Sequence, residues 1–490
     1  INKLNEYKEN NRLEAKKASD SLPRTLWETY SSFANSYGGV ILLGASENAD
    51  GSLSISGIDN SRKMLTEFWN LVNNPQKVST NLLCDKDVEL IELDGKHIIA
   101  VHVPRAERDR RPVYINNNIC DGTFRRNWEG DYHCTQAEVK AMLRDQPEET
   151  VDMKILEEFD MSVLNFDTVH GYRQRHQNYR PGHPWENLND YEYLKNIGAA
   201  RLSHTDGKLH PTAAGLLMFG NEYNIVTEFP EYFLDYRETM DPSTRWTDRL
   251  QSSSGEWSGN LCDFYFRVYN KLIQDVKVPF KFEDGHRVDD TPIHKALREG
   301  LANCLINTDY YIARGIVIRK SPEAIIMENP GNIRVGAEQM IKGGTSDPRN
   351  KALMKMFNLI NIGERAGSGI PDIFSAWNSQ GWQEPAIEEQ FAPNRTIITL
   401  PLTQKQAEKT SGKNKRKKQA EKTIAAKAFI ADFLEENGAS GVQDIAIEIE
   451  KSLPRTRELM RELIQENIVE AQGEGPARKY ILKDNQSKLK

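Results

Sequence analysis

The chain has 490 residues, of which 38% are hydrophobic and 28% charged, and it carries a net charge of −7. This composition indicates a globular protein with about three domains, each long enough to bury its own core. A membrane-spanning protein is excluded, because no apolar run approaches the roughly 20 residues that a span requires and no signal-peptide pattern is present. Five dispersed cysteines without Cys-x-x-Cys spacing argue against a disulfide framework and a zinc site, so we expect a protein of the reducing cytoplasm.

The first 150 residues predict one α+β domain. Apolar residues at helical spacing, with Pro23 near the first turn, predict a helix over residues 22–37 that Gly38 ends. The all-apolar run that follows, residues 40–43, is typical of a buried strand. Further strands are predicted over 88–93, 97–103 and 112–115.

Three motifs of this region resemble the Schlafen AlbA-like family: Glu9 with Leu13-Glu14-Ala-Lys16, the run from Ser32 to Gly44, and Gly122-Thr-Phe-Arg-Arg126. The resemblance implies a nucleic-acid-binding domain. In eukaryotic Schlafen proteins a related fold cuts transfer RNA with acidic residues, and Glu9 and Glu14 match the first acidic pair in spacing. Converging carboxylates could hold a divalent metal for phosphodiester cleavage. The alternative is that these residues form a solvated helix face.

Arginines flank the last predicted strand of this domain. Arg125 and Arg126 are candidates for phosphate contacts, because guanidinium groups bind phosphate oxygens in pairs. Neighbouring acidic residues such as Glu129 could instead balance these charges at the surface.

Residues 151–284 form a polar connector that contains three apolar segments. His210 to Gly220 resembles the segment that joins two domains in predicted regulators of this family, and it predicts a short buried helix or strand. Residues 228–236 predict a strand, and the aromatic spacing within 255–276 predicts a core helix.

The segment from 285 to 403 begins with a helix that carries two polar residues one turn apart, Glu299 and Asn303, and Asp309 follows its end. Two glycine turns lie downstream. The first contains Gly331 after Asn329, and the second contains Gly363, Gly367 and Gly369.

This order resembles the nucleotide pocket of the gyrase/Hsp90/histidine-kinase (GHKL) ATPases, and more closely the degenerate form named after the RecG helicase C-terminus. The resemblance implies that Asn303 holds Mg²⁺, that Glu299 positions water and that the second glycine turn cradles the phosphates of ATP. Asn329 stands where the ATPases place an adenine-reading Asp. This chain also contains Asp347-Pro-Arg349-Asn350, a segment that matches the same family of predicted regulators. Backbone amides at glycine turns bind phosphate, although glycines also serve ordinary tight turns.

The last predicted domain, residues 423–483, reads as a winged helix after a basic linker over 404–422. Helices are predicted over 424–435, 442–449 and 453–465, and strands near 468–471 and 479–482 form the wing. The outer face of the third helix and the wing provide the candidate DNA contacts, which are Arg455, Thr456, Arg457, Arg461 and Lys479.

Together these features predict an α+β multidomain protein: an AlbA-like domain, a GHKL-ATPase-like α/β sandwich and a C-terminal winged helix-turn-helix. We expect a DNA-binding transcriptional regulator that forms a homo-oligomer, with double-stranded DNA as the partner and RNA as the other candidate. Its middle domain would sense ATP with Mg²⁺. The alternative is an enzyme, either an ATPase or a metal-dependent nuclease. A helicase is disfavoured, because the sequence has no Gly-x-x-x-x-Gly-Lys-[Ser/Thr] loop.

Overall fold

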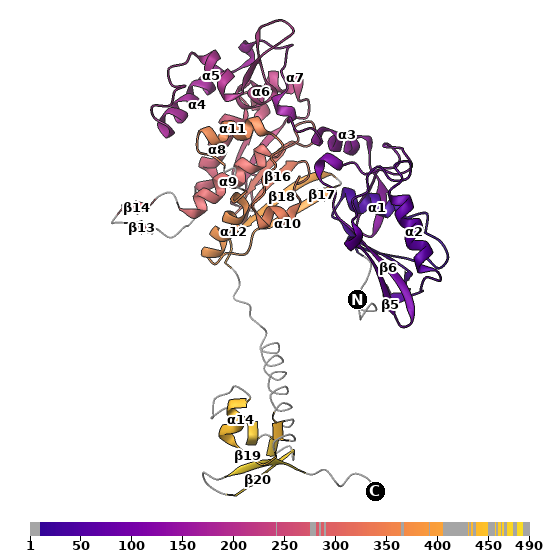
Figure 1. The fold of residues 1–490 in the computed structure, drawn as a ribbon. Helices are drawn as coiled ribbons and strands as arrows, with labels where there is room; N and C mark the ends of the chain where they lie inside the picture. Colours follow the sequence, from indigo (N-terminus) through magenta and orange to yellow (C-terminus); the bar gives the residue numbers. More distant parts are fainter. Residues whose placement is uncertain are drawn as a thin grey trace. The chain divides into compact units, whose positions relative to one another are not determined.

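The computed structural model divides into two compact units, Ile1–Gln404 and Lys405–Lys490 (Figure 1). In the first unit it describes residues 10–241, 243–274, 281–283, 286–288, 291–363, 367–391 and 393–404. In the second it describes 430, 433–434, 438–448, 456, 459–461, 463–464, 468–473 and 478–483. Among the helices in these ranges, none combines the length and apolarity needed to cross a membrane.

The N-terminal domain is built on a four-stranded sheet in the order β1-β2-β6-β5. Strand β1 (Leu13–Lys16) runs parallel to β2 (Gly39–Leu43), and β6 (Lys96–Val103) and β5 (Val88–Leu93) follow antiparallel. Glu14 therefore lies on a strand, and the alternative of a solvated helix face was wrong. The other elements are β3 (Ala45–Glu47), β4 (Leu53–Ile55), β7 (Phe124–Asn127), β8 (Gly130–His133), α1 (Leu26–Asn35), α2 (Ser61–Val72) and α3 (Gln136–Asp145).

Helix α1 packs its aromatic face, including Tyr30 and Phe33, into the core of this domain. It occupies the central part of the predicted helix and ends before Gly38, whose positive φ of 71° suits glycine. The strand predicted over 112–115 does not form. The amide of Val113 donates to Asn35 Oδ1 and its carbonyl accepts from Ser31 Oγ. Side chains of α1 thus take the backbone groups that a neighbouring strand would use.

The connector contributes strands to the sheet of the middle domain. Six strands follow the order β12-β11-β15-β16-β18-β17, and the first two, β11 (Leu234–Glu238) and β12 (Asp248–Gln251), come from residues before 284. The strand predicted over 228–236 is therefore displaced toward its end. The other four are β15 (Ile316–Lys320), β16 (Ala324–Pro330), β17 (Ala386–Phe391) and β18 (Asn394–Pro401). Only the β11–β15 pair is parallel within this sheet.

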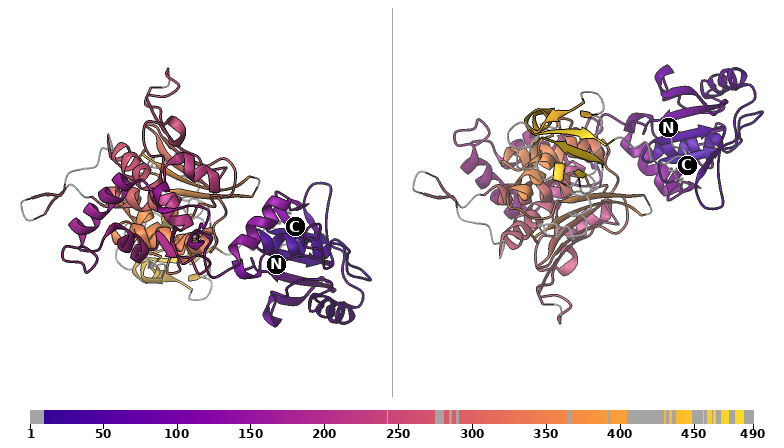
Figure 2. Two further views of the ribbon diagram at one scale, coloured as in Figure 1. Left: turned by 90° about the horizontal axis from the view of Figure 1, so that it is seen from above. Right: turned by 90° about the horizontal axis from the view of Figure 1, so that it is seen from below.

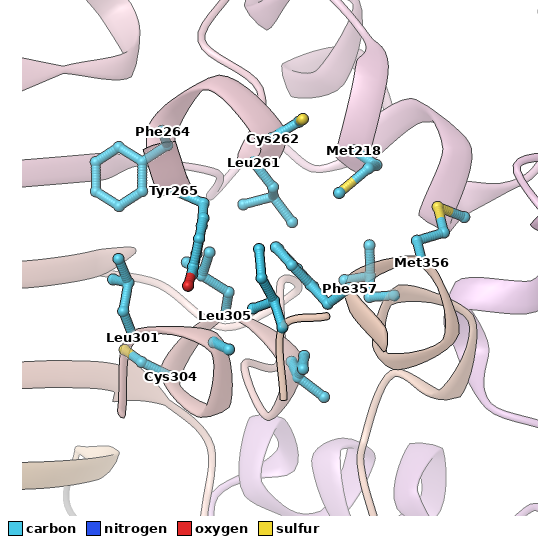
Figure 3. Close-up of a cluster of buried hydrophobic side chains, with 14 of the residues drawn as sticks. Met218, Leu261, Cys262, Phe264, Tyr265, Leu301, Cys304, Leu305, Met356 and Phe357 are labelled. Carbon is cyan, nitrogen blue, oxygen red and sulfur yellow. The ribbon is translucent and has the colours of Figure 1, made fainter. Parts of the chain in front are cut away.

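Helices α8 (Leu261–Ile273), α9 (Pro292–Ile306), α11 (Lys351–Leu359) and α12 (Gly369–Ser379) bury one core with this sheet. Figure 3 shows part of that core, where Leu261 and Tyr265 of α8 lie near Leu305 of α9 and Phe357 of α11. The segment expected to form a buried helix or strand is α6 (Ala213–Phe219), a helix whose seven residues are all buried.

The first unit also contains other described helices and strands, several of which contribute residues to this core. They are α4 (Phe166–Tyr179), α5 (Asp190–Ile197), β9 (Ala200–Leu202), β10 (Leu209–Pro211), α7 (Glu222–Glu228), β13 (Lys281–Glu283), β14 (His286–Val288) and α10 (Ala337–Lys342). Strands β13 and β14 pair only with each other among the described strands, and Figure 2 shows them apart from the six-stranded sheet in both views.

The second unit contains a three-stranded sheet in the order β19-β21-β20, formed by β19 (Ser440–Gly441), β20 (Val469–Gln472) and β21 (Lys479–Leu482). Helix α14 (Val442–Glu448) and the helical residues 456, 459–461 and 463–464 share an apolar cluster with it, which includes Ile445, Leu459 and Leu463. Helix α14, the other helical residues, β20 and β21 fall where the sequence predicts helices and wing strands, whereas β19 was not predicted. The winged helix as a whole stays a prediction, because much of its third helix and wing tip lies outside the described residues.

Candidate nucleotide pocket and its junction with the N-terminal domain

Helix α9 is fixed in place by its apolar face. Thr291 caps its first turn and Pro292 occupies the first helical position, where a missing N–H costs nothing. Leu297, Leu301 and Leu305 are fully buried. Gly300 faces β16, where a Cβ would make an ordinary contact of 3.4 Å with Met327 Sδ. This packing directs a different face of α9, with Glu299 and Asn303, toward the start of α12.

Glu299 and Asn303 interact with each other. Asn303 Nδ2 donates to Glu299 Oε1 at 3.0 Å, as their spacing of one turn allows. The same carboxylate oxygen lies against Gly369, the first residue of α12, so closely that a Cβ on Gly369 would be 2.1 Å from it. The donation to Glu299 leaves Oδ1 of Asn303 as the side-chain atom that could bind a metal ion.

A partly open cleft with a cavity volume of about 90 Å³ lies here. Its floor is apolar, with Cys304, Ile370 and Ile398. Asn329 and Thr396, from β16 and β18, provide polar groups on the sheet side. Small-molecule sites typically span about 300–1,000 Å³ and combine an apolar lining with a few polar groups. The cleft has such a lining, but its volume is below this range, so a whole nucleotide would extend beyond it into solvent.

The cavity brings together five of the residues that the resemblance implicated: Glu299, Asn303, Asn329, Gly367 and Gly369. They come from α9, β16 and the turn that leads into α12. The N-terminal end of α12 adds a favourable environment for an anion, because its first backbone N–H groups have no partners within the helix. The donor set therefore suits a nucleotide with a divalent cation, and the roles of these residues stay predictions.

Three of the implicated residues do not line this cavity. Asp309 instead forms an ion pair with Arg144 at 2.8 Å, and Gly331 packs under the guanidinium of Arg349. Gly363 follows α11 with a positive φ of 76°, as an ordinary turn glycine would. The expected contacts of these three residues with the cofactor gain no support from this cavity and stay predictions.

Two arginines of the cavity wall, Arg334 and Arg349, were missed as site residues. Arg349 belongs to the Asp-Pro-Arg-Asn segment, which the family resemblance includes but to which it assigns no function. In the structure Arg349 donates to the carbonyl of Asn307 at the end of α9 and to the carbonyl of Asn332. Asn350 of the same segment donates to the carbonyls of Ile306 and Thr308.

Both arginines also bind Asp145, the last residue of α3. Burial disfavours the ionised carboxylate, but Arg349 and Arg334 outweigh this effect and hold the pKa of Asp145 well below its usual range. For Arg349, burial opposes the charge and Asp145 outweighs it, so the pKa of Arg349 is raised. The junction between the N-terminal and middle domains thus contains ionised, paired side chains beside the cavity, with two arginines on one carboxylate.

The candidate acids and arginines of the N-terminal domain form a separate cluster. Arg126 is fully buried and pairs with Glu14 at 2.8 Å and with Asp131 at 2.9 Å. Lys16 binds the second oxygen of Glu14 at 2.9 Å. This placement contradicts a phosphate contact by Arg126, because its charge is compensated inside the domain. Arg125 is mostly covered and pairs with Glu138 at 2.8 Å.

The structure gives no support to metal binding by Glu14, because its two carboxylate oxygens are bound by Lys16 and Arg126. Glu9 lies outside the described residues. Among the side chains that the structure describes, no group of three or more His, Cys, Asp or Glu could hold a metal ion.

In the second unit, Thr456 is fully buried, so its expected place on the outer, DNA-facing side of the third helix is wrong. Arg461 and Lys479 are exposed. Arg455 and Arg457 lie outside the described residues. Arg461 and Lys479 are therefore the candidate DNA contacts in this unit that the structure places at the surface.

Comparison with known families agrees with the two resemblances. Residues 3–135 match the family described as "Schlafen, AlbA_2", and residues 314–400 match "Putative ATP-dependent DNA helicase recG C-terminal". Residues 140–235 match a "Domain of unknown function (DUF8451)". The predicted relationship of the N-terminal and middle domains is thereby confirmed. Helix α9, with Glu299 and Asn303, precedes the second of these matches, so its assignment to the site rests on geometry.

Two solved structures are similar to the chain. The DIP2311 protein from Corynebacterium diphtheriae is 14% identical over 96% of this chain and 95% of its own, with a TM-score of 0.40. The N-terminal domain of a putative ATP-dependent DNA helicase RecG-related protein from Nitrosomonas europaea is 28% identical over 27% of this chain and 89% of its own, with a TM-score of 0.22. Scores this low assign neither fold nor function. No curated protein matches the sequence.

Proposed function

We propose that this protein, which carries a Schlafen AlbA_2 domain and a RecG C-terminal-like domain, is a DNA-binding transcriptional regulator whose middle domain binds ATP with Mg²⁺. The observation that carries the nucleotide part is the convergence of Glu299, Asn303, Asn329 and Gly369 on one cleft. These residues come from α9, β16 and the start of α12, which are far apart in the sequence.

The cleft suits a nucleotide in one orientation. Asn329 and Thr396 lie beside the apolar floor, where a flat base would exclude water. The Asn329 amide could donate to the base, and the Thr396 hydroxyl, which donates to the carbonyl of Gly331, could accept from it. The start of α12 favours phosphates near Glu299 and Asn303, and the wall arginines Arg334 and Arg349 add positive charge to the cleft. Asn303 Oδ1 would complete the shell of a Mg²⁺ ion that keeps most of its waters, and the ion would neutralise phosphate charge. Glu299, held by Asn303, is the group that could orient water.

The nucleic-acid part is supported by the family match over residues 3–135 and by the exposed basic residues Arg461 and Lys479. Surface lysine and arginine favour binding to a phosphate backbone, because they neutralise phosphates and release the counterions bound there. We propose double-stranded DNA as the partner and a homo-oligomer as the binding form, since dimeric regulators read symmetric half-sites. The nuclease alternative finds less support, because Glu14 is already paired with Lys16 and Arg126.

A titration of ATP with Mg²⁺ against the wild-type protein and Asn303→Ala tests the nucleotide site. We expect saturable binding that the substitution weakens strongly, and released phosphate in the same samples would show turnover. The control is Asn178→Ala, which removes a solvent-exposed amide on α4. Equal binding by wild type and Asn303→Ala, or no binding by either, would refute the site.

A further inference from the structure

The two arginines that line the cleft, Arg334 and Arg349, both bind the carboxylate of Asp145. Arg349 donates through Nε to Asp145 Oδ1 at 3.0 Å and through Nη2 to Oδ2 at 2.9 Å. Arg334 donates through Nε and Nη2 to Oδ1 at 3.1 and 2.8 Å. In both arginines the forked edge of the guanidinium faces the carboxylate. That edge is also the one with which arginine binds a phosphate group through two parallel hydrogen bonds.

The two arginines stand between the cleft and Asp145. Both line the cleft, whereas Asp145 lines two smaller cavities next to it. The side chains of Arg334 and Arg349 are only 4% and 9% exposed, so each needs an anionic or carbonyl partner in either arrangement. A further polar atom of this wall, Oδ1 of Asn332, is buried without a hydrogen-bond partner. This oxygen is an acceptor, so it could take a hydrogen bond from a donor group of the ligand, whereas the anion would be bound by the arginines.

Charge at the junction is unbalanced in favour of an added anion. Asp347 pairs with Arg108 at 2.7 Å and lies 3.6 Å from Arg334. Arg108, Arg334 and Arg349 thus share two carboxylates, those of Asp145 and Asp347. Arg111 is also buried here, where burial and the nearby Arg105 lower the pKa of its guanidinium to about 9. It therefore stays largely charged at pH 7.

We propose that Arg334 and Arg349 form an anion subsite for the phosphate groups of the cleft's ligand, and that Asp145 of the N-terminal domain competes with those phosphates for the two arginines. This inference rests on the proposed function and deepens it. A ligand phosphate would turn one or both guanidinium edges from Asp145 toward the cleft. Ligand binding and docking of α3 on the middle domain are then negatively coupled, and each weakens the other by the same factor.

The experiment measures binding and docking together in the full chain. Asp145→Asn keeps the shape of the side chain and removes its charge. We expect it to bind ATP with Mg²⁺, and pyrophosphate alone, about 5- to 150-fold more tightly than wild type, the usual range of coupling between two sites. In wild type, either probe should increase amide hydrogen exchange along α3, and Asp145→Asn should exchange faster there without any probe. The matched control is Glu149→Gln, which removes an exposed carboxylate paired with Arg201.

The outcomes separate this inference from the proposed function. ATP binding that is equal in wild type and Asp145→Asn, with unchanged exchange along α3, overturns the competition while the nucleotide site stands. Tighter pyrophosphate binding by Asp145→Asn without any ATP binding supports the anion subsite and refutes ATP as its ligand. Absence of binding by both probes to every variant overturns both. If Asp145→Asn does not fold, the exchange measurement on wild type decides alone.

Discussion

Glu299 Oε1 occupies the space that a side chain on Gly369 would need, since a Cβ there would lie 2.1 Å away. The contact joins the middle of α9 to the first residue of α12 and holds the carboxylate beside Asn303. Gly369 does not have a positive φ, so the reason for glycine is the close approach of this carboxylate rather than the backbone conformation.

Gly369→Ala should therefore displace Glu299 and weaken ligand binding more than it weakens the fold. We expect ATP affinity to fall about tenfold, which equals about 1.4 kcal/mol. Isothermal titration of wild type and variant measures the affinity, and urea unfolding checks the stability. Gly171→Ala on α4 is the control, because the nearest atom to its Cβ is the flexible end of Arg175 at 3.3 Å. Unchanged affinity in Gly369→Ala would show that Glu299 can move without consequence.

Arg126→Ala should destabilise the N-terminal domain by about 3–5 kcal/mol, the usual cost of removing one partner from a buried ion pair. Its side chain is fully buried, and its loss would leave Glu14 and Asp131 without their guanidinium. Urea unfolding measures the effect. Replacing the exposed Arg24 with Ala should change the free energy of unfolding by no more than about 0.5 kcal/mol. A DNA-binding defect in Arg126→Ala would thus result from loss of structure. If Arg126→Ala were as stable as wild type, the structural role of the buried ion pairs would be contradicted.

His210 should stabilise the fold more at low pH than at high pH. Its Nδ1 lies 2.6 Å from the carbonyl of Phe159 and its Nε2 lies 2.9 Å from Asp206 Oδ2, an arrangement that favours the doubly protonated ring. The hydrogen bond to Phe159, followed by that to Asp206, raises the pKa of His210. Because the folded pKa exceeds the unfolded one, near 6.5, this stabilisation is complete below pH 6.5 and is lost as the pH rises through the folded pKa.

The measurement is urea unfolding of wild type and His210→Gln at pH 5.5 and pH 8.5. The stability difference between the two proteins should be larger at pH 5.5. His204→Gln, at an exposed position, should show no such pH dependence. A difference that grows toward high pH would mean that the neutral ring is the stabilising form.

Arg461→Ala combined with Lys479→Ala should weaken duplex binding without affecting the fold, because both residues are exposed. Each lost phosphate contact should reduce the slope of log K against log salt by about 1. Fluorescence anisotropy at several salt concentrations measures that slope, and Gln443→Ala is the control at another exposed position. A slope equal to that of wild type would place the DNA contacts elsewhere. Thr456, which is buried, should affect stability instead.

The sequence by itself determined most backbone conformations. The apolar run before Gly44 forms β2, the aromatic spacing within 255–276 forms α8, and the spacing in α9 places Glu299 one turn from Asn303. These features depend on side-chain periodicity and glycine punctuation, which act over a few residues. The motifs also identified both matched domains. The strand expected over 112–115 failed because side chains of α1, far away in sequence, took the backbone hydrogen bonds of Val113.

Only the tertiary structure decided where the charges lie. Nothing local distinguishes Arg126, which is buried between two carboxylates, from an arginine that binds phosphate at the surface. Likewise, Arg349 meets Asp145 across 204 residues, and Asp309 turns away from the cleft toward Arg144. A charged side chain is long and flexible, and its partner is whichever opposite charge the packed core brings near it. Periodicity sets which face of an element is buried, and the assembled fold sets what that face meets.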